Sequence, residues 1–594
     1  MVENNSFSSF LRTRLLMRFL ASLFIAAVFF VGGCGNGHQS TANKSASNVT
    51  LPQYYMNGMV FQSGKPFIVK GKANPGASLT ISIGAQSAST TAGADGTFRA
   101  KVPASPASLD PYELTVTSGG RVVKDIKRVY SGELFIAAGQ SNMEASYDLY
   151  YKDDKDASIN MKNVITRSDL PSLTKDANIH YIKTDQQSSD SPTTNLPLRY
   201  STDSWLDASS SSNKMSYTAY YAAIAMRRKH PNVPVGVIDV SWGGTNISTQ
   251  LGKIWNNHMN PLSGFNVGGV VWYQGESDSS YNIPSWMREQ FYLNNNGKDL
   301  PGLIDKFRTL VGDEKLPFVV VQLTRSDLTN FFYSPIRDAQ SKTVMQKENT
   351  VLVSTLDTDK GTSELIHPLG KDIIGTRAGE ILSSMIAGDT PSQGPIPSQA
   401  TTNGTTVTVT FKGDTGKGLK AMSPIYNRTA TSSHYATADT SSDIDEVEVA
   451  GSDGVFQPAK ARVSGDTLIV SAQGIKGSPT QVRYAWNNQP AHPNLYNGKN
   501  LPAGTFVMDI DGATVNPKPR SVLFNDDGGA GTVTPLSGDA GTQAQIPAKV
   551  PVRTKYTFKE WNTQANGSGT AYHPGDAITI PDKNLTTLYA IWTN

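Results

Sequence analysis

Residue types suited to acyl transfer follow several short apolar runs in this chain. Ser141 stands in the stretch AAGQSNME, directly after the apolar run at 133–136. A serine hydroxyl becomes a nucleophile when a base removes its proton, and imidazole suits that task because its pKa lies near neutral pH. His367 is the candidate base, because the other histidines lie outside any strand end with this pattern. Ser141 and His367 together predict acyl transfer with the serine as nucleophile.

An acid that accepts a hydrogen bond from the second ring nitrogen would fix the orientation of His367. Glu364 precedes the histidine by three residues and is the candidate acid. Asp357 is a second candidate, and a backbone carbonyl group is a third. Asp357, Asp359 and Glu364 superficially suggest a calcium site, but the loop is too short for an EF-hand. We therefore expect no metal and no other cofactor.

Donors for the oxyanion of a tetrahedral intermediate follow two further runs. The stretch SWGGTN offers the backbone amides of Gly243 and Gly244, and WYQGESD offers the side-chain amide of Gln274. The backbone amide of Ser141 would complete the oxyanion hole. Two alternatives stay open: the glycine pair could be a tight turn, and Gln274 could be a buried amide that satisfies backbone groups.

Two more polar residues adjoin these groups. Asn142 follows the serine, and Glu276 lies two residues after Gln274. Glu276 could orient the amide of Gln274 or line the pocket. We predict that Asn142 and Glu276 bind substrate.

The segment from 129 to 390 alternates apolar runs with helix-like stretches. Helical spacing predicts helices at 217–228 and 303–311, with the tyrosines at 217–221 packed in the core. Strands that alternate with helices indicate an α/β fold, with a parallel sheet covered by helices on both faces. Reactive residues should lie just past the carboxyl ends of the strands. The runs are at 134–137, 235–240, 267–272, 318–322 and 351–356.

Segments that alternate apolar with polar residues flank this α/β segment. Residues 51–128 predict a small antiparallel β-sandwich, and residues 391–512 predict a second β-rich domain. A Pro-rich joint then leads into a further β module at 520–594. The sequence thus predicts a catalytic α/β domain between β domains.

The overall composition excludes some classes of protein. The chain has 594 residues, a formal net charge of +3 and a single cysteine, Cys34. Its basic residues form no dense block, so we expect no nucleic-acid partner. One cysteine excludes an intramolecular disulfide and a thiolate metal cluster.

The N-terminus resembles a bacterial lipoprotein signal. Arginines precede an apolar run at 19–31, and VGGC ends at Cys34 like a lipobox. The run is short for a permanent membrane span, which needs ~20 residues. An ordinary secretory signal with an incidental cysteine is the alternative. The resemblance implies a signal peptide at 1–34, lipidation of Cys34, a flexible tether at 35–50, and anchoring to the outer face of a bacterial cell membrane.

Several motifs together resemble the sialate O-acetylesterase family, a branch of the SGNH hydrolases. They are GQSNM, SWGGT, WYQGESD and IHPLGK followed by IGTRAGE, with further matches between about 51 and 508. The resemblance implies Ser141 as nucleophile, His367 as base, and Gln274 with a glycine of WGG in the oxyanion hole. SGNH hydrolases usually carry aspartate where this chain has Glu364. The tail at 520–594 resembles a Listeria-Bacteroides type repeat, a module of surface proteins.

Two functions of different classes follow from these observations. The first is a serine esterase that removes acetyl groups from sugars, with O-acetylated sialic acids as the first candidate and acetylxylan or another polysaccharide as the runner-up. The second is an inactive carbohydrate-binding surface lipoprotein. The intact Ser141, Gln274 and His367 favour the esterase. The C-terminal repeat is expected to serve as a spacer or to contact a cell-surface partner.

Overall fold

The computed structural model describes residues 46–147, 169–200, 203–279, 285–328, 331–512, 520–527, 533, 536–538, 541–581 and 585–593. The predicted signal peptide, Cys34 and most of the predicted tether lie outside the described residues. Within the described ranges, no helix combines the length and apolar character needed to cross a bilayer.

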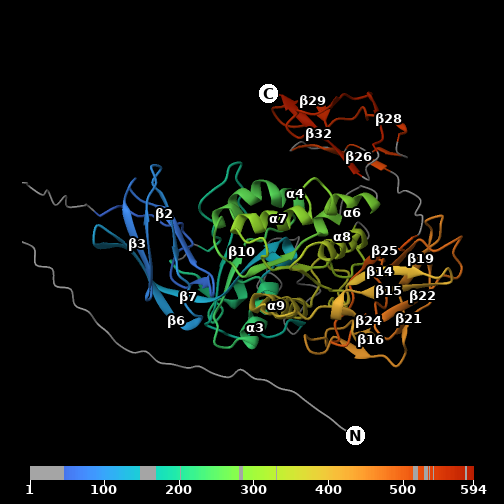
Figure 1. Ribbon diagram of the computed structural model, residues 1–594, viewed down its shortest axis with the longest axis horizontal. Helices are drawn as coiled ribbons and strands as arrows, with labels where there is room; N and C mark the ends of the chain where they lie inside the picture. The colour runs from blue at the N-terminus through green and yellow to red at the C-terminus, as the bar shows by residue number, and fades with distance from the viewer. Residues whose placement is uncertain are drawn as a thin grey trace, which may run out of the picture. The chain divides into compact units, whose positions relative to one another are not determined.

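A mostly parallel sheet forms the centre of the α/β domain (Figure 1). All neighbouring strands in it run parallel except the last pair, which is antiparallel. The five predicted apolar runs are all strands of this sheet, which confirms the predicted fold class. Its order is β13 (Thr350–Val353), β12 (Phe318–Val321), β11 (Gly269–Tyr273), β7 (Arg121–Gly139), β10 (Val235–Asp239), β8 (Ile179–Lys183) and β9 (Leu206–Asp207).

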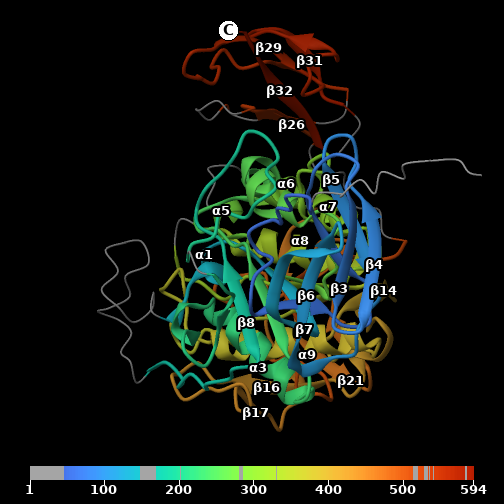
Figure 2. The ribbon, with the colours of Figure 1, turned by 90° about the vertical axis from the view of Figure 1, so that its left-hand side faces the viewer.

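Helices cover both faces of this sheet. In Figures 1 and 2, α3 (Tyr217–Lys229) and α9 (Lys371–Ala387) lie on one side, and α7 (Leu300–Val311) and α8 (Tyr333–Gln346) lie on the other. Helices α3 and α7 confirm the two predicted helices. The tyrosines of α3 pack edge to face and are buried, as predicted. The shorter helices are α1 (Ser141–Glu144), α4 (Ile247–Thr249), α5 (Glu276–Ser279), α6 (Ser285–Leu293), η2 (Ser212–Lys214), η3 (Gln250–Met259), η4 (Asn260–Leu262) and η5 (Gly413–Gly416).

The glycines of IGTRAGE let α9 approach α3 closely. A Cβ atom on Gly375 would lie 2.4 Å from the carbonyl oxygen of Thr218, and one on Gly379 would lie 2.1 Å from that of Ala222. Both distances are far below van der Waals contact, so only glycine permits this spacing. Thr218 in turn donates a hydrogen bond from its hydroxyl to the carbonyl of Asn142 at 3.0 Å. The motif therefore supports the segment that carries Ser141.

This close packing makes a testable prediction for Gly379. Helix propensity alone would make Gly379→Ala stabilising by up to about 1 kcal/mol. We expect the opposite sign, a loss of about 1–3 kcal/mol in the free energy of unfolding, because the new methyl group meets backbone of α3. Urea denaturation of the two proteins measures this difference. A more stable variant would show that the helices are not in close contact.

The N-terminal β region shares a strand with the α/β domain. The first half of β7 pairs with β1 and β6, and its second half pairs with β10 and β11. Buried apolar residues of both regions form one contiguous core. The two predicted domains that meet at 128 are thus built on one continuous strand. The strands of this region are β1 (Met59–Gln62), β2 (Phe67–Lys72), β3 (Ser78–Ile83), β4 (Gln86–Thr91), β5 (Thr97–Val102) and β6 (Ser108–Ser118).

The C-terminal β domain has its own apolar core, which also takes in Leu356 from the loop after β13. Its strands form sheets of the order β14-β15-β22-β21-β18, β20-β19-β23-β25 and β17-β16-β24. They are β14 (Pro397–Thr402), β15 (Thr406–Phe411), β16 (Lys420–Pro424), β17 (Ala436–Ala438), β18 (Asp443–Ile444), β19 (Val447–Ala450), β20 (Phe456–Pro458), β21 (Ala461–Ser464), β22 (Thr467–Ser471), β23 (Gln481–Tyr484), β24 (Leu495–Tyr496) and β25 (Phe506–Asp509).

The last module is also a β structure with a separate core, in which Trp561 is fully buried. Its main sheet has the order β27-β26-β32-β29-β30, and β28 pairs with β31. The strands are β26 (Arg520–Asn525), β27 (Leu536–Gly538), β28 (Gln543–Gln545), β29 (Thr557–Asn562), β30 (Ala571–Tyr572), β31 (Ala577–Thr579) and β32 (Leu585–Thr593).

Candidate active site

Ser141 begins helix α1 immediately after the central strand β7. Strand β7 ends at Gly139, which has φ +136° and approaches β11 so closely that a Cβ atom would lie 2.1 Å from the carbonyl oxygen of Tyr273. The amide of Gln140 then donates a hydrogen bond to this same carbonyl at 3.0 Å. Only glycine fits such an approach, so the turn places the serine between the ends of β10 and β11. Ser141 is 6% exposed.

The glycine pair after β10 packs against the serine. A Cβ atom on Gly243 would lie 3.2 Å from the Cβ of Ser141. The amide of Gly243 donates a hydrogen bond to a carboxylate oxygen of Glu144 at 2.7 Å. Gly244 has φ +71° and open space around it. Gly243 therefore lies beside Ser141, and its amide is engaged by a carboxylate.

Glu144 is a site residue that the sequence analysis missed. Its buried carboxylate also accepts hydrogen bonds from the side-chain amide of Gln186, at 2.9 and 3.0 Å, and lies 3.4 Å from the guanidinium group of Arg199. It therefore ties together the helix of the serine, the glycine loop and the segment after β8. Its position in GQSNME, one helical turn after the serine, was the available signal.

Gln274 is fully buried, and its side-chain amide is engaged on both sides. The amide nitrogen donates to the side-chain oxygen of Gln140 at 3.2 Å, to the carbonyl of Thr245 at 3.1 Å and to the carboxylate of Asp278. The amide oxygen accepts from the hydroxyl of Tyr292 at 2.9 Å. An oxyanion-hole role for Gln274 thus requires that the substrate oxygen replace one of these acceptors.

The acidic residues after β11 are buried. Burial raises the pKa of Asp278 to about 7, although Gln274 and the amide of Ile247 donate hydrogen bonds to it. Burial also raises the pKa of Glu276, which accepts a hydrogen bond from the side-chain amide of Asn142. Lys371 opposes this rise through its positive charge. Both carboxyl groups therefore bind protons more tightly in the folded chain than in water.

Asn142 links the helix of the serine to the loop of the histidine. Its amide nitrogen donates to Glu276 and, at 3.0 Å, to the carbonyl of Ile366, the residue before His367. Its amide oxygen accepts from the ammonium group of Lys371 at 2.6 Å. Asn142 and Glu276 therefore take part in a buried network, and their contact with substrate stays a prediction. Lys371, which ends the motif IHPLGK, is a second residue that the sequence analysis missed.

His367 and the candidate acids occupy different surroundings. His367 is 3% exposed, whereas Glu364 of the same loop is exposed. Asp357 is fully buried and forms a two-pronged ion pair with Arg377, at 2.7 Å for each oxygen. It also accepts a hydrogen bond from the hydroxyl of Tyr496 at 3.1 Å. Both oxygens of Asp357 are thus already bound to other groups.

No group of three His, Cys, Asp or Glu side chains within the described ranges is arranged to hold a metal ion.

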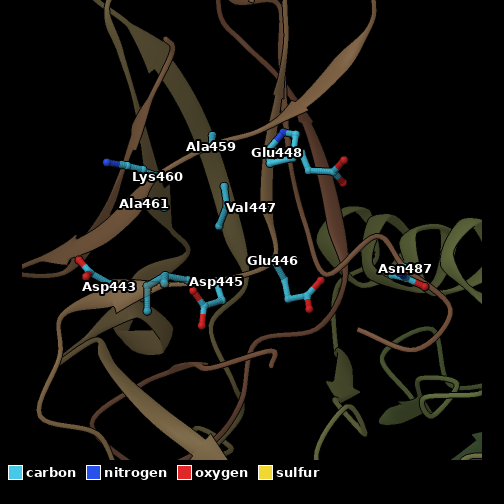
Figure 3. Close-up of a pocket in the computed structure, with 11 residues that line it drawn as sticks. Asp443, Asp445, Glu446, Val447, Glu448, Ala459, Lys460, Ala461 and Asn487 are labelled. Carbon is cyan, nitrogen blue, oxygen red and sulfur yellow. The ribbon is translucent and has the colours of Figure 1, made fainter. Parts of the chain in front are cut away.

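A cavity of about 740 Å³ lies in the C-terminal β domain and is shown in Figure 3. Its lining includes Glu448, which pairs with Arg483 at 2.8 Å, and Asp445, which pairs with His492 at 2.7 Å. The residues that line this cavity include no serine and no histidine, so the cavity does not offer the pair of side chains that acyl transfer by a serine needs.

The buried carboxyl group of Asp278 predicts a pH-dependent effect on stability. Its folded pKa of about 7 exceeds the ordinary value of 3.8, so between these values the folded state binds a proton that the unfolded state releases. This group therefore makes the protein less stable as pH rises through that window. In Asp278→Asn the amide oxygen can still accept both hydrogen bonds, and the dependence should disappear.

We expect the stability of Asp278→Asn relative to the wild type to grow by about 2 kcal/mol between about pH 5 and about pH 7. Urea denaturation at both pH values measures it. Asp453→Asn, at an exposed carboxylate, is the matched control and should show no such growth. Equal differences at the two pH values would contradict the raised pKa of Asp278.

Comparison with known proteins assigns this domain to a class. Residues 131–368 match the model of the family described as "Carbohydrate esterase, sialic acid-specific acetylesterase". The resemblance of the motifs to this family of ester hydrolases is thus confirmed for residues 131–368. Residues 521–591 match the model of the Listeria-Bacteroides repeat domain, which confirms the resemblance of the C-terminal tail to this repeat.

Individual relatives agree with this class. Sialate O-acetylesterase of Homo sapiens is 24% identical over 343 residues, which are 48% of this chain and 60% of the human protein. The enzyme of Mus musculus is 24% identical over 290 residues, which are 44% of this chain and 48% of the mouse protein. The chain therefore spans about 60% or less of the length of these two relatives. The crystal structure of a carbohydrate acetylesterase from Xanthomonas citri aligns with a TM-score of 0.62 at 25% identity, covering 78% of this chain and 99% of that chain.

Proposed function

We propose that this protein is a serine esterase that removes O-acetyl groups from sugars, with O-acetylated sialic acids as the first candidate substrates. One observation carries the proposal: Asn142, next to Ser141, holds the carbonyl of the residue before His367 at 3.0 Å. A nucleophile candidate and a base candidate from distant parts of the sequence thus lie on directly bonded segments. The matched family and the relatives support the choice of an acetyl ester.

The proposed reaction has two stages. His367 takes the proton of Ser141 while the serine oxygen bonds to the acetyl carbon, and the bond between that carbon and the sugar oxygen breaks as the sugar oxygen receives the proton. Water then attacks the acetyl-serine with His367 as base, which releases acetate and restores the serine. The backbone amides of Ser141 and Gly244 are the proposed oxyanion donors. Gly243 and Gln274 can join them once each exchanges an acceptor that it now binds.

A panel of esters tests this proposal. Acetate release is measured from 4-nitrophenyl acetate, 9-O-acetylated sialic acid and acetylated xylan, with the chain after Cys34 and its Ser141→Ala variant side by side. Release from the sialic acid ester by the wild type alone supports the sialate assignment. Release from xylan but not from the sialic acid ester moves the assignment to polysaccharides. No release from any ester by the folded protein favours the carbohydrate-binding alternative.

We further propose that the protein is lipid-anchored through Cys34 on the outer face of a bacterial cell membrane. The arginines, apolar run and VGGC sequence support this proposal. In bacterial cells that express the full chain, the wild type should sediment with membranes, and Cys34→Ala should move to the soluble fraction. A Cys34→Ala variant that still sediments with membranes would contradict lipidation as the anchor.

A further inference from the structure

Side chains of the C-terminal β domain contact the loop that leads to His367. We call residues 354–366, which lie between β13 and this histidine, the histidine segment. Leu356 of this segment is fully buried in the apolar core of the C-terminal β domain. The carbonyl of Leu356 accepts a hydrogen bond from the hydroxyl of Tyr426 at 3.0 Å, and the hydroxyl of Ser354 donates to the carbonyl of Ala503 at 3.0 Å. The start of the segment is therefore bound to the second domain.

The next residue, Asp357, is held from both domains. Arg377 of helix α9 binds both of its carboxylate oxygens, and the hydroxyl of Tyr496 donates to one of them at 3.1 Å. Asp357 and Tyr496 are each fully buried. A buried carboxylate with three donors has little freedom to move, because loss of any one partner leaves a desolvated charge less compensated. This residue thus joins the histidine segment to β24.

A third contact lies closer to the histidine. The side-chain amide of Gln489 donates to the hydroxyl oxygen of Ser363 at 2.6 Å. The carbonyl of Asn488, in the same loop of the β domain, accepts from the amide of Ser326, and the amide of Asp327 donates to the carbonyl of Ser363 at 3.1 Å. The histidine segment is thus fastened near its beginning and near its end.

The far end of the segment is held from the side of the serine. Asn142 donates its hydrogen bond to the carbonyl of Ile366. The segment is therefore clamped between the C-terminal β domain and the helix that begins with Ser141. A catalytic base must be held within about 0.5 Å of its productive position, and a misplacement of about 1 Å can cost ~10²-fold in rate.

We propose that the C-terminal β domain is a positioning part of the active site, in which Tyr426, Tyr496 and Gln489 hold the histidine segment so that His367 meets Ser141. The proposal rests on the proposed esterase function and assigns this domain a role other than sugar recognition. Its three residues are positioning residues, since they act through the segment and not on the substrate.

The test uses the chain after Cys34 with the double substitution Tyr426→Phe and Tyr496→Phe, which removes two hydroxyl groups and keeps both rings. Tyr112→Phe is the matched control, because it also removes one tyrosine hydroxyl and keeps the ring, and that hydroxyl donates to the carbonyl of Pro106 at 3.2 Å within the N-terminal β region. Hydrogen exchange of the histidine segment and the kinetics of 4-nitrophenyl acetate hydrolysis are measured for each protein.

We expect amides of the histidine segment to exchange at least about tenfold faster in the double variant, and kcat to fall about 10- to 100-fold with KM nearly unchanged. The control should match the wild type in both. Unchanged exchange, a rise in KM alone, or an equal loss in the control would each overturn the proposal. Hydrogen exchange tests whether the C-terminal β domain holds the histidine segment, even if the chain has no esterase activity. A failure of the positioning proposal can therefore be told apart from a failure of the proposed esterase function.

Discussion

Ser141→Ala should lower kcat for acetyl ester hydrolysis by at least about 10³-fold, because the variant has no oxygen that can form the acetyl intermediate. The substitution removes one buried oxygen at the start of α1 and leaves the network of Asn142 and Glu144 in place. Its thermal unfolding midpoint should therefore stay close to that of the wild type. Acetate release from 4-nitrophenyl acetate measures the effect.

Ser87→Ala, at an exposed serine of β4, is the control for this experiment and should keep the wild-type rate. A Ser141→Ala protein that is folded and still hydrolyses the ester at a comparable rate would exclude Ser141 as nucleophile. The search would then move to other side chains along the same sheet edge.

His367→Asn should have an effect of similar size, about 10³-fold or more on kcat, because the serine then lacks a base near neutral pH. Steady-state hydrolysis of 4-nitrophenyl acetate measures it. Full activity in the variant would show that another group removes the proton.

Glu364→Gln is the informative companion of this variant. Glu364 is exposed in the structure, so we expect a loss of less than about tenfold, within the effect of an exposed charge near a site. A loss close to that of His367→Asn would instead establish Glu364 as the acid that orients the histidine.

The positions of the site residues at strand ends could be predicted from the sequence. Strand β7 lies between β10 and β11, with Tyr273 opposite Gly139 and Asp239 opposite Ala137. Residues just past the ends of three adjacent parallel strands must meet at one edge of the sheet. The apolar runs that mark these strands are continuous and unambiguous, so the ends of the strands could be located from the sequence alone.

The partners of these residues could not be predicted in the same way. Besides Asp278 and Tyr292, Gln274 contacts Gln140 and Thr245, which are 134 and 29 residues away along the chain. Its place in the sequence therefore did not reveal these two acceptors. Lys371 is buried although lysine is usually exposed, and there it donates a hydrogen bond to Asn142 at 2.6 Å and interacts with the charge of Glu276. Such burial depends on contacts between distant segments, which no local pattern encodes.

Strand β8 was missed for a related reason. His180 and Lys183 interrupt its apolar pattern, so the run IHYIK does not read as a buried strand. Lys183 is tolerated there because its ammonium group pairs with Asp239 of the neighbouring strand at 2.7 Å. The spacing of Glu364 to the histidine likewise could not show that its side chain faces solvent.

The central claim is that Ser141 carries the acetyl group during turnover, and peptide mass spectrometry tests it most directly. The chain after Cys34 is mixed with 4-nitrophenyl acetate, quenched in acid within the first turnovers, and digested. We predict an acetyl group on the peptide that contains Ser141, absent from the Ser141→Ala protein. An acetyl group reproducibly found on another residue, or acetate release with no acetylated peptide at all, would contradict the account.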